Sequence, residues 1–108
     1  MADEDLYLAS GTNERVYVWV YTEVDPTLYT SSPEWAMTST ASSPAGWVSG
    51  AWDDDGWSDA KGRIRAWSPR IATDLNVSTD GVYQMHVRWT SSADQLVVKQ
   101  PPYYVRLT

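Results

Sequence analysis

The sequence predicts an all-β protein, an antiparallel β-sandwich of about seven strands. Three observations predict this class in the 108 residues. No window shows sustained helical periodicity, short alternating segments recur along the chain, and turn-forming residues separate them at intervals of about 8 to 12 residues. The length suits a single hydrophobic core. We therefore expect an N-terminal arm with a short edge strand, residues 1–14, and one sandwich domain, residues 15–108.

Two segments near the start alternate as strands do. Leu6-Tyr7-Leu8 is short and ends at a cluster of turn formers, which suits an edge strand. From Arg15 to Thr22, three valines share one face, whereas Tyr17, Trp19 and Tyr21 share the other. We expect the valines in the core, and we expect the rings to be covered by a loop, a neighbouring strand or another molecule.

The middle of the chain predicts a strand and then a loop. Glu34 to Ser39 alternates, with Trp35 and Met37 on one face. Thr40 to Gly46 is rich in Ser, Ala and Pro and is too short to separate two cores.

A hairpin with a long acidic loop follows. Trp47 to Trp52 is the first strand, and Gly50 within it indicates a bulge or the close approach of another backbone. Strand pattern returns at Arg63 to Trp67. The next connection is polar, and Leu75 and Val77 are expected to lie beneath it.

The last third contains the clearest late strand. Tyr83, Met85, Val87 and Trp89 are predicted to face inward and Gln84, His86, Arg88 and Thr90 to face solvent. Gly81 followed by Tyr83 resembles the tyrosine corner of immunoglobulin-like sandwiches, in which the phenol bonds to upstream backbone. Gln95 to Lys99 is predicted to pair with this strand after a turn. Pro101-Pro102 is predicted to interrupt the backbone hydrogen bonding, because proline has no N–H to donate. The last inward-facing side chains are predicted to be Tyr103, Val105 and Leu107.

Composition excludes several classes of partner. The net charge is -6 and the eight Lys and Arg residues are scattered, which disfavours a nucleic-acid backbone. No apolar stretch approaches the roughly 20 residues that span a bilayer, and the start lacks the pattern of a secretory signal. We expect a soluble product made in the cytoplasm, with no membrane partner.

The sequence predicts no enzyme and no cofactor. There is no cysteine to act as a nucleophile or metal ligand, and the only histidine, His86, is placed on a polar face without a partner. Serines occur without a G-x-S-x-G elbow or a paired histidine.

Asp53, Asp55 and Asp59 raise the alternative of a calcium site, because hard cations prefer carboxylate oxygens near a turn-forming glycine. Their spacing does not match an EF-hand loop, which needs alternating acidic positions and a glutamate at the twelfth. A solvated turn is the simpler interpretation.

Aromatic residues are the strongest functional signal. Trp and Tyr number seven each, and Phe is absent. Rings that carry a polar N–H or O–H group are common at interfaces. About half of seven rings are expected in the core, with Trp57 the most exposed: Tyr17, Trp19, Tyr21, Trp47, Trp52, Trp57 and Trp67. The candidate partner-binding residues are Tyr17, Trp19, Tyr21, Trp57, Leu6 and Tyr7.

Three stretches carry a family resemblance, which covers the chain from about Arg15. Pro44-Ala45-Gly46-Trp47-Val48-Ser49-Gly50-Ala51-Trp52, Gly81-Val82-Tyr83-Gln84-Met85-His86-Val87-Arg88-Trp89, and Pro101-Pro102 followed by Tyr104-Val105-Arg106-Leu107 resemble segments of small immunoglobulin-like virion proteins of actinobacterial tailed bacteriophages. The insertion from Asp53 to Asp59, with its extra Trp57, departs from that family's pattern.

The resemblance implies a virion structural protein made in the host bacterial cytoplasm, most simply a capsid decoration protein on the capsid exterior. A head-tail connector component is one alternative. Partners would be the major capsid protein or other virion subunits, and further copies of the chain in a homo-oligomer. A second alternative, from the rings alone, is a carbohydrate-binding module in which Tyr17, Trp19, Tyr21 or Trp57 stack on sugars.

Overall fold

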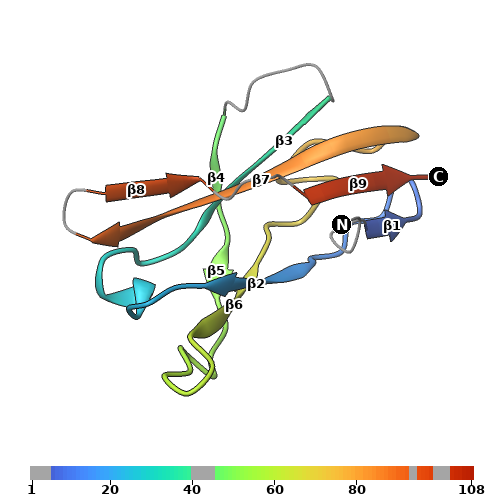
Figure 1. Ribbon diagram of the computed structural model, residues 1–108. Helices are drawn as coiled ribbons and strands as arrows, with labels where there is room; N and C mark the ends of the chain where they lie inside the picture. The colour runs from blue at the N-terminus through green and yellow to red at the C-terminus, as the bar shows by residue number, and fades with distance from the viewer. Residues whose placement is uncertain (1–5, 40–45, 93–94, 99–102) are drawn as a thin grey trace.

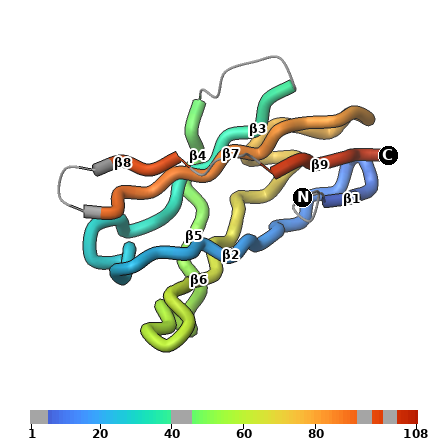
Figure 2. The backbone as a smooth tube through the Cα atoms, viewed as in Figure 1, coloured from blue at the N-terminus to red at the C-terminus, as the bar shows by residue number. Residues whose placement is uncertain are grey.

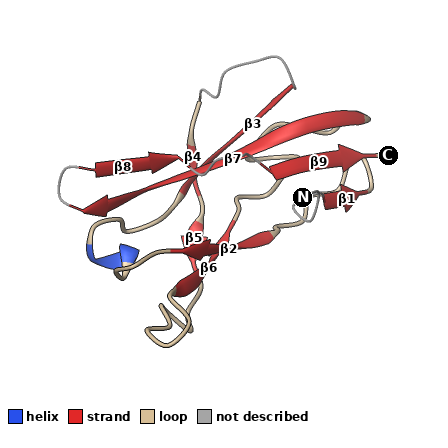
Figure 3. Cartoon of the chain, in the orientation of Figure 1, coloured by secondary structure: helices blue, strands red, loops and turns tan. Residues whose placement is uncertain are grey.

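The computed structural model describes residues 6–39, 46–92, 95–98 and 103–108, which form two β-sheets packed face to face (Figure 1). The all-β prediction is confirmed, and the described residues contain no α-helix. One 3-10 turn, η1 (Pro26–Leu28), lies between β2 and β3 (Figure 3). Nothing in these ranges is a helix long and apolar enough to cross a membrane. The strands are β1 (Leu6–Leu8), β2 (Tyr17–Tyr21), β3 (Glu34–Ser39), β4 (Val48–Ser49), β5 (Ala51–Trp52), β6 (Arg63–Trp67), β7 (Gly81–Ser92), β8 (Gln95–Val98) and β9 (Tyr103–Leu107).

The larger sheet has the order β1-β9-β7-β3-β4, and β8 pairs with the C-terminal part of β7. Its pairings are antiparallel except one: β1 lies parallel to β9, with Leu6 opposite Val105. The sheet is therefore mixed, and the prediction of a wholly antiparallel arrangement is wrong at this edge. Alternation in Leu6-Tyr7-Leu8 predicts a strand but carries no information on its direction relative to a partner.

The smaller sheet has the order β2-β6-β5 and is antiparallel throughout. The predicted hairpin is present with a shorter first strand, because only β5 from that strand pairs with β6, and its long loop extends away from both sheets (Figure 2). Strand β2 lies at the outer edge of this sheet, because β6 is its only partner among the described strands.

One core lies between the two sheets. The smaller sheet contributes Val18, Val20, Ile64 and Ala66, and the larger sheet contributes Trp35, Met85, Val87, Trp89, Tyr103, Val105 and Leu107. These are the side chains that period-two alternation places inward, because successive residues of a strand point to opposite faces. Leu75 and Val77 pack against the core from their connection, as the sequence predicts.

Gly50 is the point at which the chain passes from one sheet to the other, since β4 pairs with β3 whereas β5 pairs with β6. The single strand predicted from Trp47 to Trp52 is thus two short strands. A Cβ at Gly50 would collide with the Trp67 carbonyl oxygen and lie 2.5 Å from Trp35 Nε1. The predicted close approach of another backbone is confirmed, and only glycine leaves room for it.

Strand β7 begins with the predicted tyrosine bond. The hydroxyl of Tyr83 donates to the Thr79 carbonyl oxygen at 3.0 Å and lies 2.8 Å from the Thr79 hydroxyl. This bond fixes the turn that leads into β7, the longest of the described strands. The expected interruption at Pro101-Pro102 and most of the loop from Thr40 to Gly46 lie outside the described residues.

Candidate functional site

The outer face of the smaller sheet brings rings and cations together. Alternation along β2 and β6 places six side chains on this side of the sheet, where register pairs Tyr17 with Trp67, Trp19 with Arg65 and Tyr21 with Arg63. We call these six residues the aromatic-arginine face. The sequence predicts the three rings of β2 on one surface, and the structure shows that β6 adds two arginines and a tryptophan to it.

The arginines lie over the rings. The guanidinium carbon of Arg63 is 3.9 Å from the centroid of Trp19, and that of Arg65 is 5.2 Å from Tyr17 and 5.5 Å from Trp19. Each distance is within the range of a cation-π interaction, about 6 Å. Arg63 Nη1 also donates to the Tyr21 hydroxyl at 3.5 Å. These contacts therefore order the side chains of the face in the isolated chain.

The rings of this face are not coplanar. Tyr17 and Trp19 are 6.2 Å apart with their planes at 87°, and Tyr17 and Trp67 are 5.0 Å apart at 54°. Arg63 already occupies one side of the Trp19 indole. A flat row of rings that could stack on consecutive sugars is absent from this face, so its geometry suits an irregular protein surface better than a polysaccharide.

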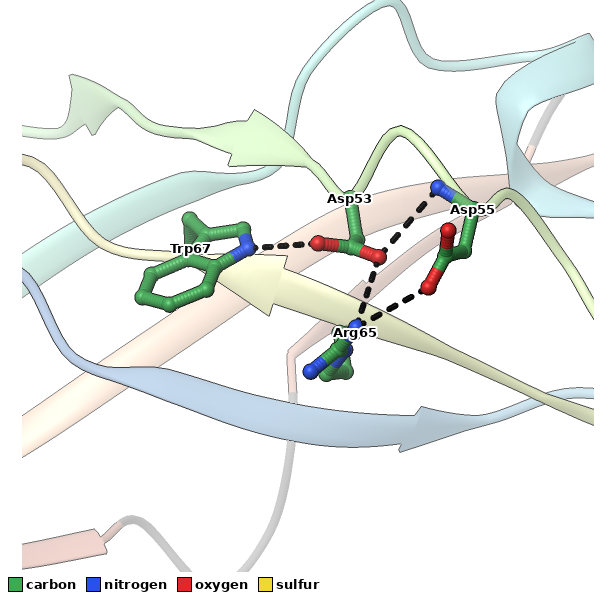
Figure 4. A network of polar contacts seen from close by, with 4 residues as sticks. All are labelled: Asp53, Asp55, Arg65 and Trp67. Atoms are coloured by element: carbon green, nitrogen blue, oxygen red, sulfur yellow. Dashed lines mark hydrogen bonds and ion pairs between the residues drawn. The ribbon is translucent and has the colours of Figure 1, made fainter.

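An acidic turn anchors one end of the face (Figure 4). Arg65 Nη2 donates to Asp53 Oδ2 at 3.0 Å and to Asp55 Oδ2 at 3.1 Å. The Trp67 indole N–H donates to Asp53 Oδ1 at 2.8 Å, and the Asp55 backbone N–H donates to Asp53 Oδ2 at 3.2 Å. Both oxygens of Asp53 are thereby used, so this carboxylate positions Arg65 and Trp67.

The surroundings of Asp53 favour its charged form. The hydrogen bond from Trp67 is the largest cause that lowers the pKa of this carboxyl, and the Asp55 N–H and the Arg65 guanidinium act in the same direction. Partial burial opposes them. Asp53 and Asp55 thus converge on a guanidinium, and no group of three His, Asp or Glu side chains among the described residues is arranged to hold a metal ion. The geometry gives the calcium alternative for Asp53, Asp55 and Asp59 no support.

A hollow of about 190 Å³ lies where the acidic turn meets the face, and its lining includes Trp19, Trp57, Lys61, Arg63 and Asp55. Arg65 is neutralised by two carboxylates, whereas the described residues offer no acidic partner to Lys61 or Arg63. The hollow therefore offers two unpaired cations beside an indole to an acidic side chain of a partner.

Trp57 is not the most exposed ring. It is half-buried and packs against the core, and its indole Nε1 is buried without a hydrogen-bond partner in the described part of the chain. The loop that carries it folds back on itself, because Ser58 bridges Arg63 and Gly62 donates to the Ser58 carbonyl. Polar neighbours in the sequence suggest exposure, but this local pairing turns the indole inward.

The structure separates Leu6 and Tyr7 from the aromatic-arginine face. Both lie on β1 in the larger sheet, where Leu6 packs against the core and Tyr7 is exposed next to Arg106 in register. Tyr7 therefore lies on the outer side of the opposite sheet and belongs to a different surface from Tyr17, Trp19 and Tyr21.

His86 is buried, and the prediction that it faces solvent is wrong. Its side chain is on the outer face of the larger sheet, but only 5% of the residue is exposed because the Trp47 ring lies over it, with centroids 6.4 Å apart. Nε2 is 3.1 Å from the Thr38 hydroxyl, and burial lowers the pKa of the imidazole. Arg88 stacks on Trp47 at 4.2 Å and donates to Glu34 at 2.8 Å, which completes the cover.

No family model, curated protein or solved structure matches the chain.

Proposed function

We propose that the chain is a non-enzymatic structural protein of a tailed-bacteriophage virion, a capsid decoration protein with an immunoglobulin-like sandwich that binds the capsid exterior. The observation that carries the proposal is the aromatic-arginine face, a surface of two exposed tyrosines with half-buried tryptophans and arginines, held by cation-π contacts and an acidic anchor. The resemblance of the sequence to virion proteins supplies the biological setting.

The chemistry of this face is that of a protein-binding surface. Trp, Tyr and Arg are the residues most enriched at energetic hot spots of protein interfaces. A side chain that is already ordered loses less conformational entropy when a partner binds. Arg63 is ordered against Trp19 and has no acidic partner among the described residues, so a capsid carboxylate would complete its interactions.

The non-enzymatic part of the proposal has its own support. His86 is bonded to Thr38 beneath Trp47 and does not face an open site. Asp53 and Asp55 are committed to Arg65, which leaves them poorly placed as a general acid and base pair.

Docking is tested by sedimentation with heads of the encoding phage that were produced without this gene. The wild-type protein is expected to pellet with the heads and to saturate at a fixed ratio to the major capsid protein. Tyr21→Ser and Arg63→Gln, both on the aromatic-arginine face, are expected to weaken binding by about tenfold each.

Two matched variants on the opposite sheet are the controls. Tyr104 and Arg106 are exposed on β9, so Tyr104→Ser and Arg106→Gln make the same chemical changes away from the proposed face. Unchanged binding of these two, with loss in the first two, supports docking through the face. Failure of the wild type to sediment with heads contradicts the proposal, and binding confined to one vertex would favour the connector alternative.

A further inference from the structure

Strand β2 has an open backbone edge. Hydrogen bonds at the two ends of its ladder with β6 fix which residues face that partner: Ser68 N–H donates to Val16 O at 2.8 Å, and Thr22 N–H donates to Gly62 O at 2.9 Å. In an antiparallel pair the bonded residues alternate, so Val18 and Val20 also bond to β6. The N–H and C=O groups of Tyr17, Trp19 and Tyr21 consequently point away from β6, and the described residues offer them no partner.

The β2 edge lacks the sequence features that prevent an edge strand from pairing with another chain. Natural edge strands are protected by proline, charged side chains, bulges or very short length. Strand β2 has five residues, contains no Pro, Gly or charge, and is regularly paired along its other side. An edge of this kind is a template for one more strand.

The sequence of the edge is nearly symmetric about Trp19. Reading outward in both directions gives Val18 and Val20, then Tyr17 and Tyr21, then Val16 and Thr22, and finally Arg15 and Glu23. A strand that reads almost the same in both directions is complementary to itself when antiparallel. The two departures from symmetry are Val16 opposite Thr22 and, at the ends, a cation at one and an anion at the other. Both end residues are exposed, with no ion pair in the described part of the chain.

We propose that two copies of the chain pair through their β2 edges, antiparallel, about a two-fold axis that passes beside Trp19. Trp19 of each copy then faces Trp19 of the other, and Tyr17 faces Tyr21. These three residue pairs each exchange two backbone hydrogen bonds, using the groups that point away from β6. Arg15 of each copy is placed at Glu23 of the second copy, so the charges at the strand ends are neutralised in the same register.

The dimer has one continuous six-stranded sheet, with the order β5-β6-β2 in each half. The aromatic-arginine faces of the two copies lie on the same side, because paired residues of adjacent strands point to one face. Self-pairing uses the backbone edge and leaves this face open. Dimerisation is therefore independent of the proposed capsid docking, and it is tested on the purified protein without heads.

The first test is mass in solution with a charge exchange. Sedimentation equilibrium is expected to give twice the 12.2 kDa of one chain for the wild type. Arg15→Glu and Glu23→Arg each create like charges at both ends of the pairing and are expected to weaken the dimer by about tenfold. The double variant exchanges the two charges and is expected to restore dimerisation, which a mere folding defect would not do.

The second test reports the register. The chain has no cysteine, so a single introduced cysteine reads out which residues meet. In the proposed pairing the two Cα atoms at position 19 are about 5.5 Å apart, within the range of a disulfide. Trp19→Cys is therefore expected to form a disulfide-linked dimer on mild oxidation. Tyr17→Cys is the control, because its own copy lies four residues further along the strand, roughly 14 Å away.

A monomeric wild type at all concentrations, or equal cross-linking of Trp19→Cys and Tyr17→Cys, would overturn the proposal. A dimer that the single charge variants leave intact would also contradict it, because such a dimer uses another surface.

Discussion

Replacing Gly50 with alanine is the sharpest test of the described fold. The added methyl carbon would lie 2.5 Å from Trp35 Nε1 and would collide with the carbonyl oxygen of Trp67. Non-bonded heavy atoms prefer about 3.5 to 4.0 Å, so one of these groups must move. Trp35 is fully buried and the Trp67 oxygen belongs to the backbone of β6, so neither can move cheaply.

The expected cost follows from these contacts. Overpacking of a well-filled core costs about 1 to 3 kcal/mol, and the rigidity of both neighbours places Gly50→Ala near 3 kcal/mol. A shift of the backbone also weakens the bond from Gly50 N–H to Pro33 O, 2.8 Å long, which contributes about 1 kcal/mol. The total of about 4 kcal/mol corresponds to a fall in Tm of about 15 °C for a domain of this size.

Thermal unfolding followed by circular dichroism measures this effect, with Gly56→Ala as the matched control. Gly56 has a φ of 76° but no atom within 4 Å of the added carbon, so only backbone strain of about 1 kcal/mol is expected. A Gly50→Ala variant as stable as Gly56→Ala would refute the crossing of the chain between the sheets at this point.

Three further predictions concern single polar groups. Tyr83→Phe removes the hydroxyl that donates to Thr79 and is expected to cost about 1 kcal/mol in urea unfolding, with an unchanged value contradicting a stabilising corner. Because the folded-state pKa of Asp53 is depressed, its contribution is present above the ordinary value of 3.8 and is lost as pH falls through the folded value. Asp53→Asn should therefore flatten the acid limb of a Tm-against-pH curve, and an unchanged limb would count against the network. The pKa of buried His86 is also depressed, so stability is expected to decline as pH falls below 6.5; His86→Phe should remove that slope, and a slope of equal size in the variant would show that another group causes it.

The sequence predicts most of the core because alternation is sufficient to assign a face. Val18 and Val20 in β2 and Tyr103, Val105 and Leu107 in β9 are buried as the period-two pattern requires. The same rule places Tyr17, Trp19 and Tyr21 on the opposite side of β2, which is the basis of the candidate site.

Alternation does not reveal what covers the second face of a sheet. His86 follows the outward pattern, yet it is buried because Trp47, 39 positions earlier in the chain, lies over it. The arginines of the candidate face were missed for a related reason. Arg63 and Arg65 alternate with Ile64 and Ala66, a signal that β6 presents two cations on one face, but their position over Trp19 depends on strand register.

Turns and crossings depend on contacts that are distant in the sequence. Trp57 is surrounded by polar residues, and its burial follows from the pairing of Ser58 with Arg63. The predicted strand is split at Gly50 because its two halves join different sheets: β4 pairs with β3, and β5 pairs with β6. A glycine inside a strand pattern predicts a bulge or a close backbone approach at Gly50, but it does not show that the chain passes from one sheet to the other there.

The proposed role of the chain as a structural component of a virion is tested most directly by its copy number in purified particles of the encoding phage. Quantitative mass spectrometry of intact virions, referenced to the major capsid protein, measures it. The proposal predicts a fixed ratio with many copies in each shell, and a few copies in each particle would indicate the connector alternative. Absence of the protein from purified virions, with the protein present in infected cells, would contradict the proposal.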